Sequence, residues 1–335
     1  MSPGRFRPAL TQRATAAAVP PIVAGRGTER SWVAGGAPGR VRTFWSDTWR
    51  ALRRDRAALV GLAMIALFVG AAAVAPVVAP FDPNRGFAEG LDDRGYPVPP
   101  LSPGPPGRPA FLLGTDGLGR DILSRIIYGA QISLLIGVGA NTLSMAIGLV
   151  IGLIGGYARG WLSQVMMRLT DTVMSIPTLL LAMALVTVLR PGLFVVMVVI
   201  ALAYWTYLAR IVFGEVRSLR EKEFVEAARC LGSGDARIVF RHVLPNLVSV
   251  AIVYATLSAA TMILSEATLS FLGIGVRPPT PSWGGMLSEG QQFFLTSPWM
   301  LISPGIALLL TLVGFNLLGD GLRDALDPRT GRRTN

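Results

Sequence analysis

The residue types that usually carry enzyme chemistry are almost absent from this sequence. Its 335 residues include one histidine, one cysteine and one lysine, which are His242, Cys230 and Lys222. A zinc site needs several His or Cys ligands, and a Walker-type phosphate loop needs the pattern G-x-x-x-x-G-K-[ST]. Lys222 stands in "REKEF", and neither H-E-x-x-H nor G-x-S-x-G occurs. We therefore expect no metal site, no nucleotide site and no catalytic residue in this chain.

Long apolar runs form the elements that must position any functional residue. The sequence is 51% hydrophobic and 15% charged, whereas soluble domains carry about a quarter charged residues. A helix of roughly 20 apolar residues crosses the ~30 Å hydrocarbon layer of a membrane. Six runs are long enough, at 57–80, 131–157, 172–189, 192–209, 246–274 and 299–319. The sequence thus predicts an all-α integral membrane protein with six transmembrane helices.

The basic residues lie mainly on one side of these spans. With the N-terminus inside, the inner segments hold 24 of the 31 lysines and arginines and the outer segments hold 7. The acidic residues divide into 12 inside, 7 outside and one within a span. This positive-inside pattern predicts a plasma (inner) membrane protein with both termini cytoplasmic. The net charge of +11 then indicates topology and a lipid membrane, with no nucleic acid as partner.

Two residues within the predicted spans have both a functional and a structural interpretation. Glu266, in "LSEATLSFLG", is an acid inside the fifth span, where ionisable groups often mark a transport pathway. Its place near the outer end equally suits packing or a hydrogen bond to a neighbouring helix. Pro177 should kink the third span, and broken helices often line pathways, although a kink can also be purely architectural.

The second span is rich in small residues, which predicts close helix–helix packing. They are Gly137, Gly139, Gly148, Gly152, Gly155 and Gly156.

Composition divides the chain into five segments. Residues 1–42, rich in Arg, Ala, Gly and Pro, predict a disordered cytoplasmic tail, and residues 43–80 a lead-in with the first span. Residues 81–128 include "YPVPPLSPGPPGRPA", which cannot be regular helix, and predict an extracytoplasmic loop. Residues 129–327 hold five further spans and a cytoplasmic loop at 210–245. A short cytoplasmic tail follows at 328–335.

The loop 210–245 contains the pattern of two short helices. In "EKEFVEAARCL" apolar residues recur at spacings of three and four, which predicts one apolar helix face. The residues of that face are Phe224, Ala227, Ala228 and Leu231. Such a helix pair suits docking into a groove on another protein, and it equally suits packing over its own helix ends.

Glycine and proline mark the ends of these two helices. Gly232 and Gly234 should end the first helix, and Ser233 or Asp235 should cap the second. Pro245 is expected to close the second helix at the start of the fifth span.

The residue order in this loop resembles the EAA loop of ABC-importer permeases. That family motif reads E-A-A, three residues, Gly, nine residues and I-x-L-P. This chain has Glu226-Ala227-Ala228, then Gly232, then His242-Val243-Leu244-Pro245, with His242 in place of Ile. "RHVLPN" is nevertheless similar to the peptide-permease branch, as are "WTYLARIVFGEV", "LLGTDGLGRDILSRIIYGAQISLLIG" and "SFLGIGVRPPTPSWGGML". Gln131 departs from the Arg expected in many relatives. The resemblance covers residues 43–327 and points to the C-type permease of dipeptide/oligopeptide ABC importers.

This resemblance implies an ABC type I importer permease fold and a subunit of an ATP-driven, binding-protein-dependent importer. ATP and Mg would be bound by two separate ATP-binding-cassette subunits. A second, homologous permease would complete a heterodimer, and an extracytoplasmic substrate-binding protein would dock on the outer loops. The motif assigns coupling to the ATPase to Glu226, Ala227, Ala228, Gly232, His242, Leu244 and Pro245.

The resemblance favours dipeptides or oligopeptides as cargo, with nickel, glutathione or another small solute as the alternative. A self-sufficient secondary transporter would need coupling carboxylates or inverted repeats, and the sequence offers neither clearly. A membrane enzyme would need a nucleophile–base or metal constellation. A third alternative is a scaffold that binds partners without transport. The glycine-rich spans and the kink at Pro177 argue only weakly against it.

Overall fold

A computed structural model describes residues 44–190 and 192–326, so the predicted tails 1–42 and 328–335 lie outside the described residues. Every regular element in these ranges is helical, apart from three isolated β-bridges. The first half contains α1 (Phe44–Arg54), α2 (Arg56–Ala73), α3 (Ala75–Val78), η1 (Ala88–Gly90), α4 (Ile122–Tyr157), α5 (Trp161–Met174) and α6 (Thr178–Leu189). The second half contains α7 (Leu193–Arg220), α8 (Glu223–Cys230), α9 (Asp235–Ile238), η2 (Val239–Val243), α10 (Leu244–Phe271), α11 (Trp283–Gln291) and α12 (Trp299–Leu326).

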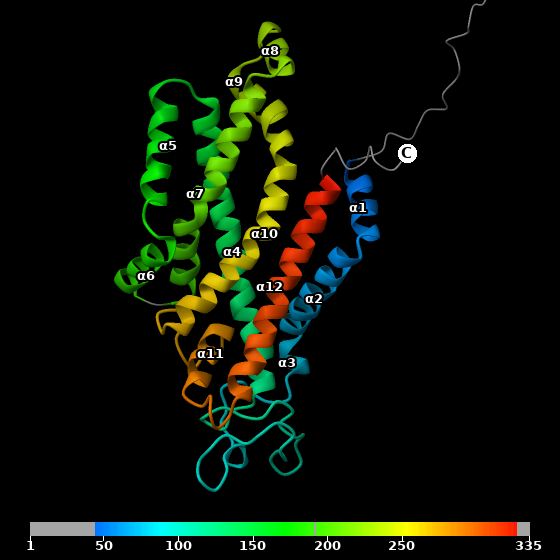
Figure 1. The fold of residues 1–335 in the computed structure, drawn as a ribbon, viewed down its shortest axis with the longest axis vertical. Helices are drawn as coiled ribbons and strands as arrows, with labels where there is room; N and C mark the ends of the chain where they lie inside the picture. Colours follow the sequence, from blue (N-terminus) through cyan, green and yellow to red (C-terminus); the bar gives the residue numbers. More distant parts are fainter. Residues whose placement is uncertain (1–43, 191, 327–335) are drawn as a thin grey trace, which may run out of the picture. The chain divides into compact units, whose positions relative to one another are not determined.

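Five of the described helical runs are long and apolar enough to cross a membrane: α2, α4, α7, the continuous run Asp235–Phe271, and α12. The bent pair α5 and α6 makes a sixth if it counts as one span. Figure 1 shows the long helices side by side, with α8 and α9 at one end and the 79–121 loop at the other. The predicted all-helical membrane fold is confirmed.

The kink predicted at Pro177 is confirmed, and it is sharp enough to divide the span predicted over 172–189 into two helices. The chain bends by 86° between α5 and α6. Pro177 has no N–H to continue the α-helical ladder, and Ile176 N–H instead bonds to the Val173 carbonyl at 3.2 Å in a tightened last turn. Because α6 has 12 residues and is about 18 Å long, it is too short to cross the membrane alone.

The first span also breaks at a proline. α2 ends at Ala73, and Pro76 in α3 cannot donate to the Ala72 carbonyl four residues earlier. The side-chain amide of Gln131, in α4, donates to that carbonyl at 2.6 Å. The side chain of Gln131 thus provides a hydrogen bond to the backbone where the helix breaks.

Small residues allow α4 to lie against α7. A Cβ atom added at Gly148 would lie 2.7 Å from the Trp205 carbonyl oxygen, and one at Gly152 would lie 2.6 Å from that of Ala209. Both distances are shorter than any normal contact, so only glycine fits. The predicted close packing of the second span is confirmed.

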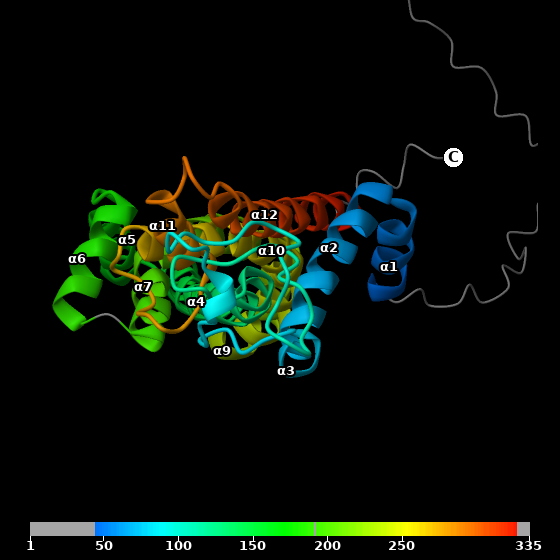
Figure 2. The same cartoon turned by 90° about the horizontal axis from the view of Figure 1, so that it is seen from below.

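The 79–121 loop covers the lower helix ends, as the view from below in Figure 2 shows. Its small core is aromatic: the ring centroid of Phe81 lies 5.1 Å from that of Phe87 and 5.1 Å from that of Phe111. α4 begins at Ile122, inside the segment predicted as loop up to residue 128, because Asp121 caps it.

Candidate functional site

The α8–α9 element, residues 223–243, projects beyond the long helices at the upper end of Figure 1. α8 ends in a Schellman motif: the Ser233 N–H donates to Ala228 O at 3.0 Å and the Gly232 N–H to Arg229 O at 3.0 Å. Gly232 has φ +79°, a conformation that glycine adopts without strain. Gly232 therefore makes the predicted turn.

The start of the second helix differs from the prediction. Gly234 is the N-cap of α9 and no side chain caps it, so neither Ser233 nor Asp235 has that role. The Asp235 carboxylate instead accepts a hydrogen bond of 2.6 Å from the Tyr157 hydroxyl, at the end of α4. A tertiary contact has replaced the local cap.

The predicted helix end at Pro245 is wrong. Residues Asp235–Phe271 form one helical run, in which η2 is a π-helical turn. The Leu244 N–H donates to Val239 O, five residues earlier, and Pro245 occupies the first turn of α10, where no N–H is needed. The Asn246 side chain donates to the His242 carbonyl at 2.6 Å. The wider turn thus carries the helix through the proline.

The predicted apolar face of α8 is split between the interior and the surface. Val225 and Ala228 are buried in a cluster with Val216 of α7 and Ile238 of α9. Ala227, predicted on the same face, is exposed.

Three large apolar side chains of the element remain on its surface. The exposed fraction is 41% for Phe224, 87% for Leu231 and 67% for Phe240. The element thus packs on its own helices and still presents apolar side chains outward. Both structural alternatives, packing over its own helix ends and a surface open to another protein, are therefore present.

Tyr157 connects the α8–α9 element to α4, a contact that no sequence pattern predicted. Besides donating to Asp235, its hydroxyl accepts a hydrogen bond of 3.4 Å from Arg229 of α8. Tyr157 is 72 residues from Arg229 and 78 from Asp235, so no local pattern could reveal the contact. Movement of either short helix should therefore be transmitted to α4.

The seven motif residues all lie at this end of the molecule, with different exposures. Glu226 and Pro245 are exposed, whereas His242 and Leu244 are half-buried. The two pathway candidates, Pro177 and Glu266, are not part of this cluster.

Glu266 is buried and hydrogen-bonded within the protein. Its side chain is fully buried in α10, and one carboxyl oxygen accepts a 2.7 Å hydrogen bond from Ser270. The Ser270 hydroxyl in turn accepts from the Val276 N–H at 3.2 Å. These contacts fix the turn that follows α10 and favour the structural interpretation of this acid.

Pro177 lies at a break that is tied to α7 on both sides. Asp171 of α5 forms an ion pair with Arg210. On the other side of the break, the hydroxyl groups of Thr178 and Tyr207 are 3.4 Å apart. Tyr207 is 43% exposed, so a polar group stands open beside the bend.

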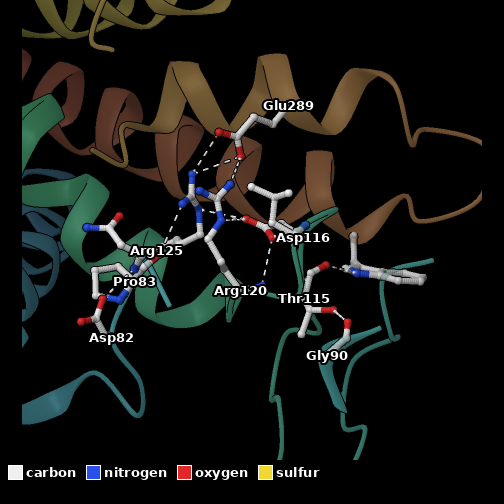
Figure 3. Close-up of polar contacts among 11 residues, drawn as sticks. Asp82, Pro83, Gly90, Thr115, Asp116, Arg120, Arg125 and Glu289 are labelled. Carbon is white, nitrogen blue, oxygen red and sulfur yellow. Dashed lines mark hydrogen bonds and ion pairs between the residues drawn. The ribbon is translucent and has the colours of Figure 1, made fainter. Parts of the chain in front are cut away.

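A buried charge network lies at the opposite end of the molecule (Figure 3). Arg120 donates to Asp116 at 2.6 Å and to Glu289 of α11 at 2.9 Å. Arg125 donates to both Glu289 oxygens at 3.2 and 3.1 Å and to the Pro83 carbonyl at 3.3 Å. Asp116, Arg120 and Arg125 are each at most 6% exposed. Two arginines and two carboxylates thus join the loop, α4 and α11 in one neutral cluster.

Asp121 completes the attachment of the loop to α4. Its carboxylate accepts from the Ser124 N–H at 2.8 Å and from the Ser124 hydroxyl at 2.7 Å. That hydroxyl also accepts from the Phe81 N–H at 3.0 Å. Burial raises the pKa of Asp121, and the hydrogen bonds from Ser124 oppose the shift.

Comparison with known families matches two parts of the chain. Residues 148–332 match the family described as binding-protein-dependent transport system inner membrane component. Residues 43–100 match the N-terminal TM domain of oligopeptide transport permease C.

Curated relatives match most of the chain. The di/tripeptide transport system permease protein DppC of Pseudomonas aeruginosa (strain UCBPP-PA14) is 41% identical over 283 residues, which are 84% of this chain and 91% of the relative. The glutathione transport system permease protein GsiD of Escherichia coli O157:H7 is 41% identical over 292 residues, 87% of this chain and 93% of the relative.

Among solved structures, an inward-facing conformation of the MetNI methionine ABC transporter has a chain with a similar fold. The TM-score is 0.52 at 18% identity, and the match covers 62% of this chain and 98% of that one.

Proposed function

Because the chain belongs to the binding-protein-dependent transport system inner membrane component family, we propose that it is the permease half that couples an ATPase to peptide import through its α8–α9 element. It is an integral membrane permease, and its family works with ATPase and substrate-binding partners. A second, homologous permease would form the other half of the pathway. The positive-inside pattern supports a cytoplasmic position for the α8–α9 element and both termini.

The observation that carries this proposal is the exposed apolar surface of the α8–α9 element. Phe224, Leu231 and Phe240 stand open on a segment that projects from the helix bundle. A short helix with exposed apolar side chains is the form that docks in a groove of another protein. The partner we assign is an ATP-binding-cassette subunit, which would supply the nucleotide site that this sequence lacks.

Coupling in this proposal depends on how the element is attached. The Gly232 turn fixes the angle between α8 and α9, and the continuous run through η2 joins α9 to the span α10. Closure of the ATPase subunits would therefore move α10 directly and α4 through Tyr157. Such rigid-body movement of spans is an established route to alternating access. Pro177, with the open Tyr207 beside it, remains our candidate for the pathway.

We propose peptides as cargo, because the curated relatives include di/tripeptide and glutathione permeases, and glutathione is itself a short peptide. Uptake of a labelled dipeptide, glutathione and nickel by membranes that contain the assembled importer tests this assignment. Nickel uptake without peptide uptake would contradict it.

The docking proposal is tested by co-purification. We expect the wild-type chain, extracted in mild detergent from its native membrane, to retain ATPase subunits and a second permease. Leu231→Asp should lose the ATPase while it remains inserted, because a charge cannot enter an apolar groove without a large desolvation cost.

Leu295→Asp is the matched control. Leu295 is 93% exposed and follows α11 at the opposite end of the molecule, so this variant should retain the ATPase. Equal ATPase recovery with Leu231→Asp and Leu295→Asp would overturn the assignment of the α8–α9 element.

A further inference from the structure

A cluster of cationic side chains near the α8–α9 element has no role in the coupling described above. Arg159, Arg217 and Arg220 line an open cavity of about 240 Å³, together with Ser163 and Gln164. The cavity lies where α4 ends, α5 begins and α7 makes its last turns. Water occupies roughly 30 Å³ per molecule in the liquid, so the cavity has room for a phosphate-sized group. No acid is among the described residues that line it.

The charge of Arg220 already has partners in the protein. Its guanidinium donates to the carbonyls of Gly156, Tyr157 and Ala158 at 3.4, 3.2 and 3.1 Å. These are among the last carbonyls of α4, which carry the negative end of the helix dipole. Arg220 is therefore explained as a C-terminal cap.

Arg159 and Arg217 have no such explanation. Both are exposed, and neither forms an ion pair with any of the described residues. They face the same cavity from different elements, Arg159 from the turn before α5 and Arg217 from α7. Two guanidinium groups that converge without a counter-charge provide a site for an anion with several oxygens.

The surroundings of the cavity match the border between lipid and water. Trp161, the first residue of α5, is 73% exposed, and exposed tryptophans are typical of the headgroup level of a membrane. Farther along α5, Val165 and Leu169 are 46% and 48% exposed. The helix that borders the cavity thus also carries exposed apolar side chains.

We propose that this cavity binds the phosphate of an anionic phospholipid from the cytoplasmic leaflet. Arg159 and Arg217 would contact the phosphate oxygens, and the acyl chains would lie along the exposed apolar face of α5. A lipid fits better than free phosphate because α5, which contributes Ser163 and Gln164 to the cavity, also presents the exposed apolar side chains of Trp161, Val165 and Leu169. The inference rests on the orientation given under Proposed function.

The test is native mass spectrometry of the importer purified in mild detergent. We expect the wild-type complex to retain phosphatidylglycerol or cardiolipin. Since both guanidinium groups attract the anionic headgroup, Arg159→Gln combined with Arg217→Gln should reduce retention by about tenfold or more. Arg94→Gln combined with Arg277→Gln removes the same charge from exposed positions elsewhere and should leave retention unchanged.

A second measurement distinguishes lipid from free anion and does not depend on retention in detergent. In nanodiscs of phosphatidylethanolamine, added phosphatidylglycerol should raise the thermal unfolding midpoint of the wild-type complex but not that of the Arg159/Arg217 variant. Millimolar inorganic phosphate should have no such effect.

Two outcomes would overturn the proposal: equal lipid retention in the two double variants, or equal stabilisation by inorganic phosphate. The same mass spectra report whether ATPase subunits are bound. Loss of the lipid with the ATPase retained, or the reverse, therefore separates this inference from the coupling proposal.

Discussion

The two ends of the helix bundle hold their irregular segments by different contacts. The 79–121 loop is fixed by buried charges, with Arg125 2% exposed, and by an aromatic core. The α8–α9 element is held by a small apolar cluster and by the hydroxyl of Tyr157, while Leu231 is 87% exposed. One segment is locked to its helices, and the other keeps an apolar surface free.

This difference indicates what each end does. A network of buried ions is costly to break because each remaining charge loses its partner, so such a network keeps α4, α11 and the loop in one arrangement. A short helix pair held by few contacts can shift and can accept a partner at small cost. We infer that the loop end is a rigid platform and that the α8–α9 end is the moving contact.

The largest effect is expected when the rigid end is broken. Arg125→Ala removes a guanidinium group that is 2% exposed and that donates to Glu289 and to the Pro83 carbonyl. Arg120 then remains as the other donor to Glu289. Removal of one partner from a buried ion network costs about 3–5 kcal/mol of unfolding free energy. We expect a clear fall in the thermal unfolding midpoint of the purified complex and less protein in the membrane.

Arg94→Ala is the control for this loss, because Arg94 is exposed in the same loop and should change stability by no more than about 0.5 kcal/mol. Similar unfolding midpoints for the two variants would show that the charge network does not lock this end.

An intermediate effect is expected at the turn of the α8–α9 element. Gly232 has φ +79°, whereas proline requires about −65°, and Gly232→Pro also removes the N–H that bonds to Arg229. The forced change should cost about 1–3 kcal/mol locally and displace α8. The protein should stay inserted and hydrolyse ATP with its partners, but uptake should be lost.

Gly234→Ala is the control that shows whether loss of any glycine in this segment, and not the turn at Gly232 specifically, affects uptake. Gly234 has φ −69°, which alanine adopts freely, so uptake should be normal. Normal uptake by Gly232→Pro as well would contradict the coupling role of this turn.

The smallest effect is expected at the contact between Tyr157 of α4 and the α8–α9 element. Tyr157→Phe removes the hydroxyl that donates to Asp235 and accepts from Arg229, a loss of about 1 kcal/mol. Hydrogen exchange of the amides in α8 and α9 should become faster, while the exchange in α4 and α7 stays the same. Tyr128→Phe, at the other end of α4, should leave the exchange of α8 and α9 unchanged.

Some features that the sequence predicted correctly are local. The six apolar runs predicted the membrane helices, because hydropathy and length alone decide whether a helix can span lipid. Gly232 predicted the helix-ending turn, because the left-handed conformation favours glycine. Where local rules competed with packing, the prediction was wrong: the helix continues through Pro245 by a π-helical turn, and Asp235 bonds to Tyr157 in place of capping α9.

The amino-acid sequence was enough to predict a helical membrane permease with a motif-bearing loop between its fourth and fifth spans. The packed fold was needed to show which side of that loop is buried and which tyrosine connects it to α4. It was also needed to show one network of Asp116, Arg120, Arg125 and Glu289. The difference lies in the sequence separation of the residues involved. Helix formation and membrane insertion depend on residues a few positions apart, whereas Arg125 and Glu289 are 164 residues apart and meet only once the helices have packed.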